Sequence, residues 1–226
     1  MTAYGLKGRP VMQDIGKGKA IRRAAFIEKA YELFSSGSIE SVSLQHIADA
    51  AGYGVATLYR YFINKPALVV ETATWKWQQT IQWNRERRPD RDREGVTAAM
   101  LFAFLLESIL EMYRNQKDLL RFNQFFNIYI QAEHIDAEVM KPYADMIGEL
   151  SIGFHGVYEL GKKDGTLRTD ITEQEMFSTS LHLMLAAATR YAVGLVYQGG
   201  NDPITELQTL KDMLMQRYTV SAEANA

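Results

Sequence analysis

Residues 43–68 read SLQHIADAAGYGVATLYRYFINKPAL, and the spacing of their apolar side chains predicts two short helices that run into a third. The first helix begins at Ser43, whose hydroxyl can accept a hydrogen bond from a free backbone N–H group. An apolar face with the i, i+3, i+4, i+7 spacing of a helix follows, and it consists of Leu44, Ile47, Ala48 and Ala51. Gly52 ends this helix, because glycine adopts the left-handed conformation of a C-terminal cap without strain.

The second helix begins near Gly54 or Val55 and turns Leu58 and Phe62 inward. Gly54 has no side chain with which to cap this helix, so the helix is uncapped or is capped from Tyr53. Two helices that cross steeply and are joined by a short turn containing glycine form a helix-turn-helix.

The third helix begins after Asn64, which is a good N-cap, and carries Pro66 in its first turn. Ile63 and Leu68 have the spacing of a hydrophobic staple around this cap. Lys65 is a cation at a helix N-terminus, where it opposes the helix dipole. This placement is favourable if a phosphate docks there, because helix N-termini and lysines both bind phosphate.

Residues 24–68 resemble the DNA-binding domain of the tetracycline-repressor (TetR) family. The matching residues are Ala30, Phe34, Gly37, Val42, Ser43, Ile47, Ala48, Ala51, Gly52, Tyr53, Thr57, Leu58, Tyr59, Tyr61, Phe62, Asn64, Lys65, Pro66 and Leu68. The resemblance implies an all-α fold, with a three-helix helix-turn-helix domain over residues 19–65. A helical ligand-binding and dimerisation domain is expected over residues 66–226.

The resemblance also implies which residues meet DNA. The base-facing positions are Gln45, Val55, Ala56, Thr57, Tyr59 and Arg60, and the phosphate-facing positions are Ser43, Tyr61 and Lys65, with Thr57 a further candidate. Arg60 suits guanine and Gln45 suits adenine, while Val55 or Ala56 suits a thymine methyl group. The alternative for each is an ordinary surface residue, with Tyr59 or Tyr61 partly in the core.

Charge is distributed unevenly along the chain, although the net charge is −2. Residues 1–65 carry nine Lys and Arg against five Asp and Glu, whereas the remainder carries sixteen against twenty-two. A basic N-terminal part on an acidic body is expected when one end of a protein meets phosphate. Residues 1–18, which are rich in glycine, are predicted to form a flexible basic arm.

Composition excludes several other classes of protein. The chain contains no cysteine, so it has neither disulfides nor thiolate metal sites. The N-terminus lacks the apolar core of a signal peptide, and the longest apolar run, residues 181–197, is short and polar for a membrane span. We therefore expect a cytoplasmic protein that does not contact membranes and needs no cofactor or metal.

Beyond residue 65, helical periodicity continues to the end of the chain. The first helix of the chain is expected over 19–35, and the later helices are expected from 65 into the eighties and over 97–115, 117–132, 137–162, 172–198 and 202–220. In the helix that begins at 65, Trp75 is expected to face inward and Trp77 outward.

The helix over 172–198 is apolar nearly all round, so it is expected to be buried both by its own domain and by a second subunit. Together with the last helix it would form a four-helix dimer interface, for which the candidates are Leu181, Leu185, Ala188, Leu195, Leu207, Leu210 and Leu214. Two DNA-binding domains held about one helical turn of DNA apart would then bind the two halves of a palindrome.

The candidates for a ligand pocket are aromatic, methionine and histidine residues of the later helices, because pockets are mostly apolar with a few polar groups. They are Phe102, Tyr113, Phe122, Phe126, Tyr129, Phe154, Tyr158, His182, Met184 and Tyr191. Aromatic and methionine residues at helical spacing, however, more often belong to plain core.

Together with these patterns, the resemblance to the TetR family implies a homodimeric repressor that a small molecule releases from a palindromic operator. One alternative is a regulator without a small-molecule effector, controlled by a protein partner or by its abundance. Another is a helical enzyme or interaction bundle that carries this motif, but the four histidines lack metal-ligand spacing and no catalytic constellation is present.

Overall fold

The computed structural model describes residues 12–197 and 199–220, and over these residues the chain is all-α, as predicted. The helices are α1 (Met12–Ser36), α2 (Leu44–Ala50), α3 (Val55–Leu58), α4 (Lys65–Arg87), α5 (Ala98–Asn115), α6 (Lys117–Glu133), α7 (Ala137–Asp164), α8 (Glu173–Ala192) and α9 (Pro203–Tyr218). An isolated antiparallel bridge pairs Leu167 with Thr219.

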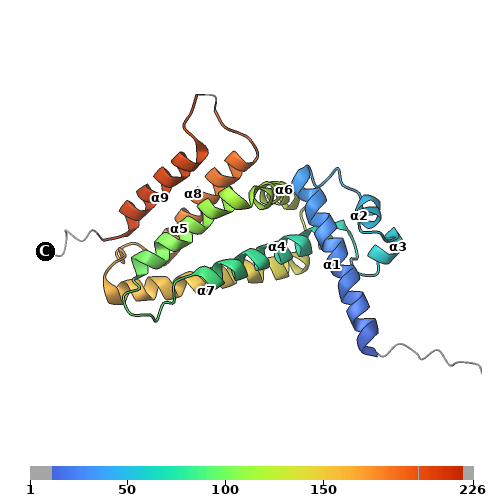
Figure 1. The fold of residues 1–226 in the computed structure, drawn as a ribbon, viewed down its shortest axis with the longest axis horizontal. Coiled ribbons are helices and arrows are strands. Elements are labelled where there is room, and N and C mark those ends of the chain that lie inside the picture. The colour runs from blue at the N-terminus through green and yellow to red at the C-terminus, as the bar shows by residue number, and fades with distance from the viewer. Residues whose placement is uncertain (1–11, 198, 221–226) are drawn as a thin grey trace, which may run out of the picture.

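The helices form a small N-terminal unit and an elongated body (Figure 1). Helices α1, α2 and α3 lie at one end, and α4 runs from this end along the body, where it packs on α7. Helices α5, α8 and α9 pack against one another, and α6 contacts both α1 and α8. The body is therefore joined to the N-terminal unit through α4 and α6.

The predicted caps of the helix-turn-helix are confirmed. The Ser43 hydroxyl accepts the His46 N–H at 3.1 Å, and the Asn64 side chain accepts the Ala67 N–H at 2.9 Å. Gly52 has a φ of +76°, which glycine adopts without a Cβ clash. The Tyr53 N–H then bonds back to the carbonyl of residue 48 at 2.9 Å and closes the end of α2.

Two helix boundaries differ from the prediction. Helix α1 begins at Met12 rather than near Lys19, so residues 12–18 of the expected arm are helical, and residues 1–11 lie outside the described part. Helix α8 ends at Ala192 rather than at residue 198. Gly194 has a φ of +83°, and the Leu195 N–H bonds to the Arg190 carbonyl at 3.1 Å, which is the Schellman pattern of a helix end.

Two packing expectations around α4 were wrong. Ile63 is 81% exposed, so it does not form a staple with the buried Leu68. Trp77 is buried and Trp75 is only half-buried, the reverse of the predicted order. Helix α4 contacts α1, α6 and α7, so more than one of its faces is covered.

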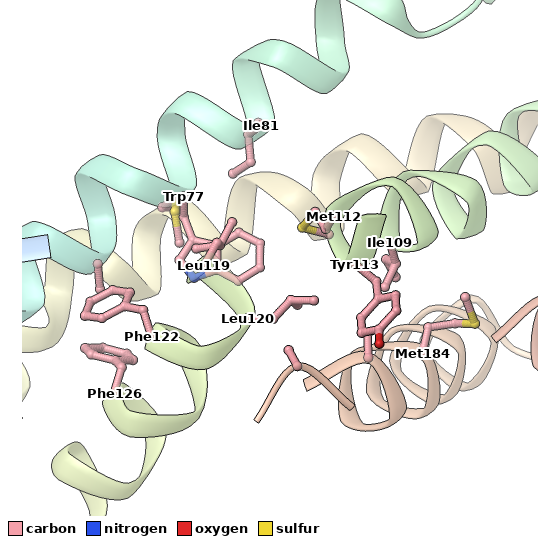
Figure 2. Close-up of a cluster of buried hydrophobic side chains, with 14 of the residues drawn as sticks. Trp77, Ile81, Ile109, Met112, Tyr113, Leu119, Leu120, Phe122, Phe126 and Met184 are labelled. Atoms are coloured by element: carbon pink, nitrogen blue, oxygen red, sulfur yellow. The ribbon is translucent and has the colours of Figure 1, made fainter. Parts of the chain in front are cut away.

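Buried side chains form one continuous core from the N-terminal unit into the body. Figure 2 shows its middle part, to which α4 contributes Trp77, α6 contributes Leu119 and Phe122, and α8 contributes Met184, together with side chains of α5. This continuity means that a change of packing in the body can reach α1 through contacts between buried side chains.

Neither a membrane-spanning helix nor a metal-binding cluster occurs among the described residues. No helix among residues 12–197 and 199–220 is long and apolar enough to cross a membrane. In the same part of the chain, no three His, Asp or Glu side chains are grouped so that they could hold a metal ion.

Candidate nucleic-acid interface

The inner faces of α2 and α3 are fixed by burial. Ile47, Ala48 and Leu58 are fully buried, and Phe62 is 2% exposed. The Phe62 ring meets the Phe26 ring of α1 edge-on, with 6.4 Å between centroids. Since the apolar side chains hold both short helices against α1, the remaining side chains of α2 and α3 must face outward.

All nine residues predicted to contact DNA are at least partly accessible. Ser43, Gln45, Ala56, Tyr59 and Arg60 are exposed, whereas Val55, Thr57, Tyr61 and Lys65 are half-buried. They lie in a short stretch that comprises the N-cap of α2, α2 itself, α3 and the turn that follows, and the first residue of α4. As Gly54 predicts, α3 has no side-chain cap.

Tyr61 contributes to the core as well as to the surface. Its ring lies 5.9 Å from the Phe26 ring, and the Tyr53 ring lies 5.4 Å from the same ring. The aromatic part of Tyr61 therefore supports the packing of α1 on the helix-turn-helix, as the alternative interpretation of the sequence allowed.

Lys65 lies between the helix-turn-helix and the body. Its ammonium donates to the Glu40 carbonyl at 3.1 Å and lies 5.8 Å from the centre of the Tyr129 ring of α6. Burial lowers the pKa of Lys65, while the charges of Glu40 and Glu133 oppose this shift. The side chain thus joins the start of α4 to α6, a structural role that the sequence did not indicate.

The exposed part of α1 adds positive charge to the N-terminal unit. Lys19 and Arg22 are exposed. Arg23, in contrast, forms an ion pair with Glu71 of α4, and its guanidinium lies 5.4 Å from the centre of the Phe62 ring. Arg23 therefore ties α1 to α4, whereas Lys19 and Arg22 remain accessible to a phosphate backbone.

A second polar pair lies on the outer face of α2. The Gln45 amide nitrogen donates to the Asp49 carboxylate at 2.7 Å, across one helical turn. Asp49 is exposed and was not among the predicted site residues. Its spacing of i, i+4 from Gln45 was visible in the sequence and is the signal that identifies the pair.

Residues 26–72 match the family model described as "Bacterial regulatory proteins, tetR family". These are the residues that form the helix-turn-helix and its support by α1 and α4. A curated relative, the HTH-type transcriptional repressor KstR2 of Rhodococcus jostii, is 25% identical over 172 residues, which are 74% of this chain and 78% of the relative.

Residues 26–72 form a TetR-family DNA-binding domain.

Solved structures agree at the level of the whole fold. A putative transcriptional regulator from Saccharomonospora viridis in complex with choline superposes with a TM-score of 0.68 at 18% identity, covering 89% of this chain and 100% of the other. The regulator FadR from Bacillus subtilis in complex with stearoyl-CoA gives 0.67 at 16% identity, covering 85% and 97%. With its TetR-type DNA-binding domain, the chain is a DNA-binding transcriptional regulator.

Helix α1 of the TetR-type domain and α6 of the body are joined by a polar contact within aromatic packing. The Tyr31 hydroxyl donates to the Asp118 carboxylate at 2.5 Å. The Phe122 ring lies 5.4 Å from the Tyr31 ring and is stacked at 6.4 Å on the Phe34 ring. Burial, together with the hydrogen bond to Asp118, raises the pKa of Tyr31 above its ordinary value. We call Tyr31, Phe34, Asp118 and Phe122 the α1–α6 latch.

The ten residues predicted to line a ligand pocket mostly form core. Eight are buried, namely Phe102, Tyr113, Phe122, Phe126, Tyr129, Phe154, Tyr158 and Met184, and they pack against one another or against neighbouring buried rings. Tyr191 is half-buried, and His182 is exposed, so His182 does not line an enclosed pocket. The alternative interpretation as packing residues describes this group better.

A cleft of about 250 Å³ lies elsewhere in the body, between the last turns of α4 and the middle of α5. Its lining consists of Trp83, Asn84, Arg87, Phe104, Glu107, Ser108 and Glu111, none of which was a predicted ligand residue. The Asn84 side-chain oxygen is buried without a hydrogen-bond partner in the described structure. The Arg87 guanidinium lies 3.9 Å from the centre of the Trp83 ring.

The carboxylates beside this cleft are already paired. Glu107 accepts hydrogen bonds from Arg114 at 2.7 Å and from Lys211 of α9 at 2.6 Å. Although burial acts in the opposite direction, these two cations hold the pKa of Glu107 below its ordinary value. The cleft therefore presents aromatic walls and one unpaired amide oxygen rather than an excess of negative charge.

The predicted dimer residues divide into two groups. Ala188, Leu207 and Leu214 are buried in the core of their own chain, so their prediction as dimer contacts was wrong. Leu181, Leu185 and Leu210 are half-buried, and Leu195 is 56% exposed in the loop after α8. The accessible apolar side chains of α8 and α9 are instead Leu183, Ile204 and Met213.

Proposed function

We propose that the chain is a homodimeric repressor that leaves a palindromic operator when a small molecule binds its helical body. The observation that carries this proposal is the course of α4. This helix begins at Lys65 beside the helix-turn-helix and ends at Arg87 in the cleft of the body.

Residues 19–65 act as the reading head in this proposal, and residues 66–226 act as the regulatory and dimerisation part. Gln45, Val55, Ala56, Thr57, Tyr59 and Arg60 meet base edges, while Ser43, Tyr61 and Lys65 approach the phosphates. The exposure of Gln45, Tyr59 and Arg60 supports their role. Because the Lys65 ammonium is shared with the Glu40 carbonyl, its phosphate contact is the one most dependent on the position of α4.

A dimer is proposed because selective binding to a palindromic operator needs two DNA-binding domains. One short recognition helix makes few base contacts, whereas two copies roughly 34 Å apart contact both half-sites of a palindrome. Leu183, Leu195, Ile204 and Met213 are among the exposed apolar side chains around α8 and α9 that a second copy would cover. They replace the buried Ala188, Leu207 and Leu214 as the proposed dimer contacts.

Helix α4 connects the ligand-binding cleft to the DNA-binding domain and can transmit a movement from one to the other. It has 23 residues, which corresponds to about 34 Å at roughly 1.5 Å per residue. A tilt of about 5° imposed at the cleft would therefore move the other end of the helix by about 3 Å, on the same rise per residue. Such a displacement alters the separation of two reading heads and hence the fit to the operator.

The α1–α6 latch gives a second route from the body to the reading head. Asp118 and Phe122 belong to α6, whereas Tyr31 and Phe34 belong to α1, which packs directly behind α2 and α3. A ligand acts through either route only if it binds one arrangement of these helices more tightly than the other.

The relatives support a small organic molecule as the signal. The Saccharomonospora viridis regulator was solved with choline and the Bacillus subtilis FadR with stearoyl-CoA, and KstR2 is described as a repressor. In this chain the cleft between α4 and α5 is the proposed point of entry, because the unpaired Asn84 oxygen favours a ligand that donates a hydrogen bond.

The proposal is tested by selecting genomic fragments that bind the full chain, followed by a compound screen for release of the enriched duplex. We expect enrichment of a palindromic sequence, salt-dependent binding and at least one compound that weakens binding about 5- to 150-fold. Absence of salt-dependent duplex binding would contradict the DNA-binding role. Tight binding that no compound relieves would contradict release by a small molecule and would favour control by a protein partner or by abundance.

A further inference from the structure

The outer face of α2 carries an acid where a DNA-binding surface is expected to be neutral or basic. Between Ser43 and Lys65 the sequence contains a single acidic residue, Asp49. It is exposed, so burial in the core does not explain its presence. Its carboxylate instead accepts the Gln45 amide N–H at 2.7 Å.

This contact determines which way the Gln45 amide faces. A carboxylate only accepts hydrogen bonds, so the NH₂ end of the amide must be the end that faces Asp49. One of the two amide N–H groups is then occupied, and the other N–H and the carbonyl oxygen remain available. The Gln45 amide can therefore still form two hydrogen bonds side by side, one as a donor and one as an acceptor, and the contact with Asp49 fixes which lies on which side. We refer to this donor and acceptor as a fork.

Among the bases, adenine matches this fork. Its major-groove edge offers N7 as an acceptor and the N6 amino group as a donor. Guanine offers two acceptors, N7 and O6, so the Gln45 carbonyl oxygen would face O6 without a shared hydrogen. Thymine offers O4 alone as an acceptor, and cytosine offers its amino group alone as a donor, so each makes one contact at most.

We propose that Asp49 is a positioning residue that orients the Gln45 amide so that it reads adenine. The inference rests on the proposed function of α2 and α3 in operator binding. Asp49 itself does not contact a base in this account. The negative charge of Asp49 also opposes the approach of phosphates, which lowers the affinity for DNA of any sequence. Its effect on Gln45, in contrast, raises the preference for adenine at one position.

The test compares base preference in a randomised duplex library for the full-length wild type and four variants. Gln45→Ala removes the reader, and Asp49→Asn keeps the shape of the side chain but lets it pair with either end of the Gln45 amide. Asp49→Glu keeps an acceptor for the amide. Glu28→Gln is the charge-matched control, because Glu28 is exposed on α1 and lies far in sequence from this pair.

We expect Gln45→Ala to lose an adenine preference of about 5- to 100-fold at one position of each half-site. Asp49→Asn should reduce the same preference by about twofold, the size expected for an i, i+4 side-chain pair, and should raise affinity for all sequences. Asp49→Glu should retain the preference. Glu28→Gln should leave the preference unchanged whatever its effect on overall affinity.

Three outcomes overturn the inference while leaving the DNA-binding role intact. The first is an unchanged base profile in Asp49→Asn, the second is a profile in which Gln45→Ala affects no single position, and the third is an equal loss of preference in Glu28→Gln. If the wild type selects no duplex from the library, the proposed function fails, and this result is distinct from all three.

Discussion

Replacing Tyr31 by phenylalanine tests whether the α1–α6 latch joins the reading head to the body. The substitution removes the hydroxyl that donates to Asp118 at 2.5 Å and leaves the ring, which is 7% exposed, in place. A hydrogen bond to a charged group contributes about 1.5–3 kcal/mol to stability. Since Asp118 is half-buried and water can partly replace the hydroxyl, we expect a loss of about 1.5 kcal/mol, at the lower end of this range.

The assay is urea unfolding at fixed protein concentration for the wild type, Tyr31→Phe, Asp118→Asn and the double variant. Fixed concentration matters because dimerisation makes apparent stability depend on it. The double-mutant cycle should give a coupling free energy of about 1.5 kcal/mol, well above the roughly 0.3–0.5 kcal/mol found for independent sites. A value within that smaller range would refute the latch as an energetic link.

Tyr143→Phe is the matched control for this cycle. The Tyr143 ring packs 4.8 Å from Phe126, but its hydroxyl has no hydrogen-bond partner among the described residues. Removing that hydroxyl should change stability by less than about 0.5 kcal/mol, as for substitutions away from specific interactions. A loss as large as that of Tyr31→Phe would mean that the effect comes from the aromatic core and not from Asp118.

Two further predictions concern assembly and pH. Met213→Asp should shift the dimer to monomer in sedimentation experiments, because Met213 is 61% exposed on α9 and a carboxylate there would be buried against the second copy. The control Ile152→Asp, at a position of α7 that is 74% exposed, should leave the dimer intact. If Met213→Asp dimerised with unchanged affinity, this face would be excluded as the dimer interface. Burial raises the pKa of Tyr129 and Tyr143 to about 12, and the hydrogen bond to Glu206 raises that of Tyr191 to about 12. The tyrosines of the unfolded chain therefore lose their protons at lower pH than those of the folded chain. The free energy of unfolding should be unchanged below about pH 10 and should fall as the pH rises from about 10 to about 12, in parallel with tyrosinate absorbance. A free energy of unfolding that stays constant over this range would contradict the raised tyrosine pKa values.

The helix-turn-helix could be predicted from the sequence because its signals are local. Ser43, Gly52 and Asn64 each act on backbone groups within a few residues, so a cap or a turn can be recognised without knowledge of the rest of the chain. The positions of the outward-facing residues followed from the same periodicity. Asp49 was not predicted because an acidic side chain does not suit a phosphate-binding surface, although its i, i+4 spacing from Gln45 is visible in the sequence.

The body was harder to predict because its packing depends on several neighbours at once. In α4, both Trp75 and Trp77 are apolar, and only the positions of α1, α6 and α7 decide which of them is buried. The apolar run of α8 hid the helix end at Gly194, whose left-handed conformation turns Leu195 out to solvent. The cleft joins residues of α4 and α5 that share no local pattern, and its unpaired Asn84 oxygen is visible only in three dimensions.

The central claim is that the exposed side of α2 and α3 reads DNA, and Arg60 tests it most directly. Arg60 is exposed, and the resemblance to the TetR family assigns it to a base edge. The measurement is the affinity of wild type and Arg60→Ala for the selected operator and for single-base variants of it, at several salt concentrations. We expect both proteins to bind in a salt-dependent manner. The wild type should prefer one base by about 5- to 100-fold at one base pair of each half-site, and Arg60→Ala should lose this preference. Equal base preferences in the two proteins, or binding that does not respond to salt, would contradict the central claim.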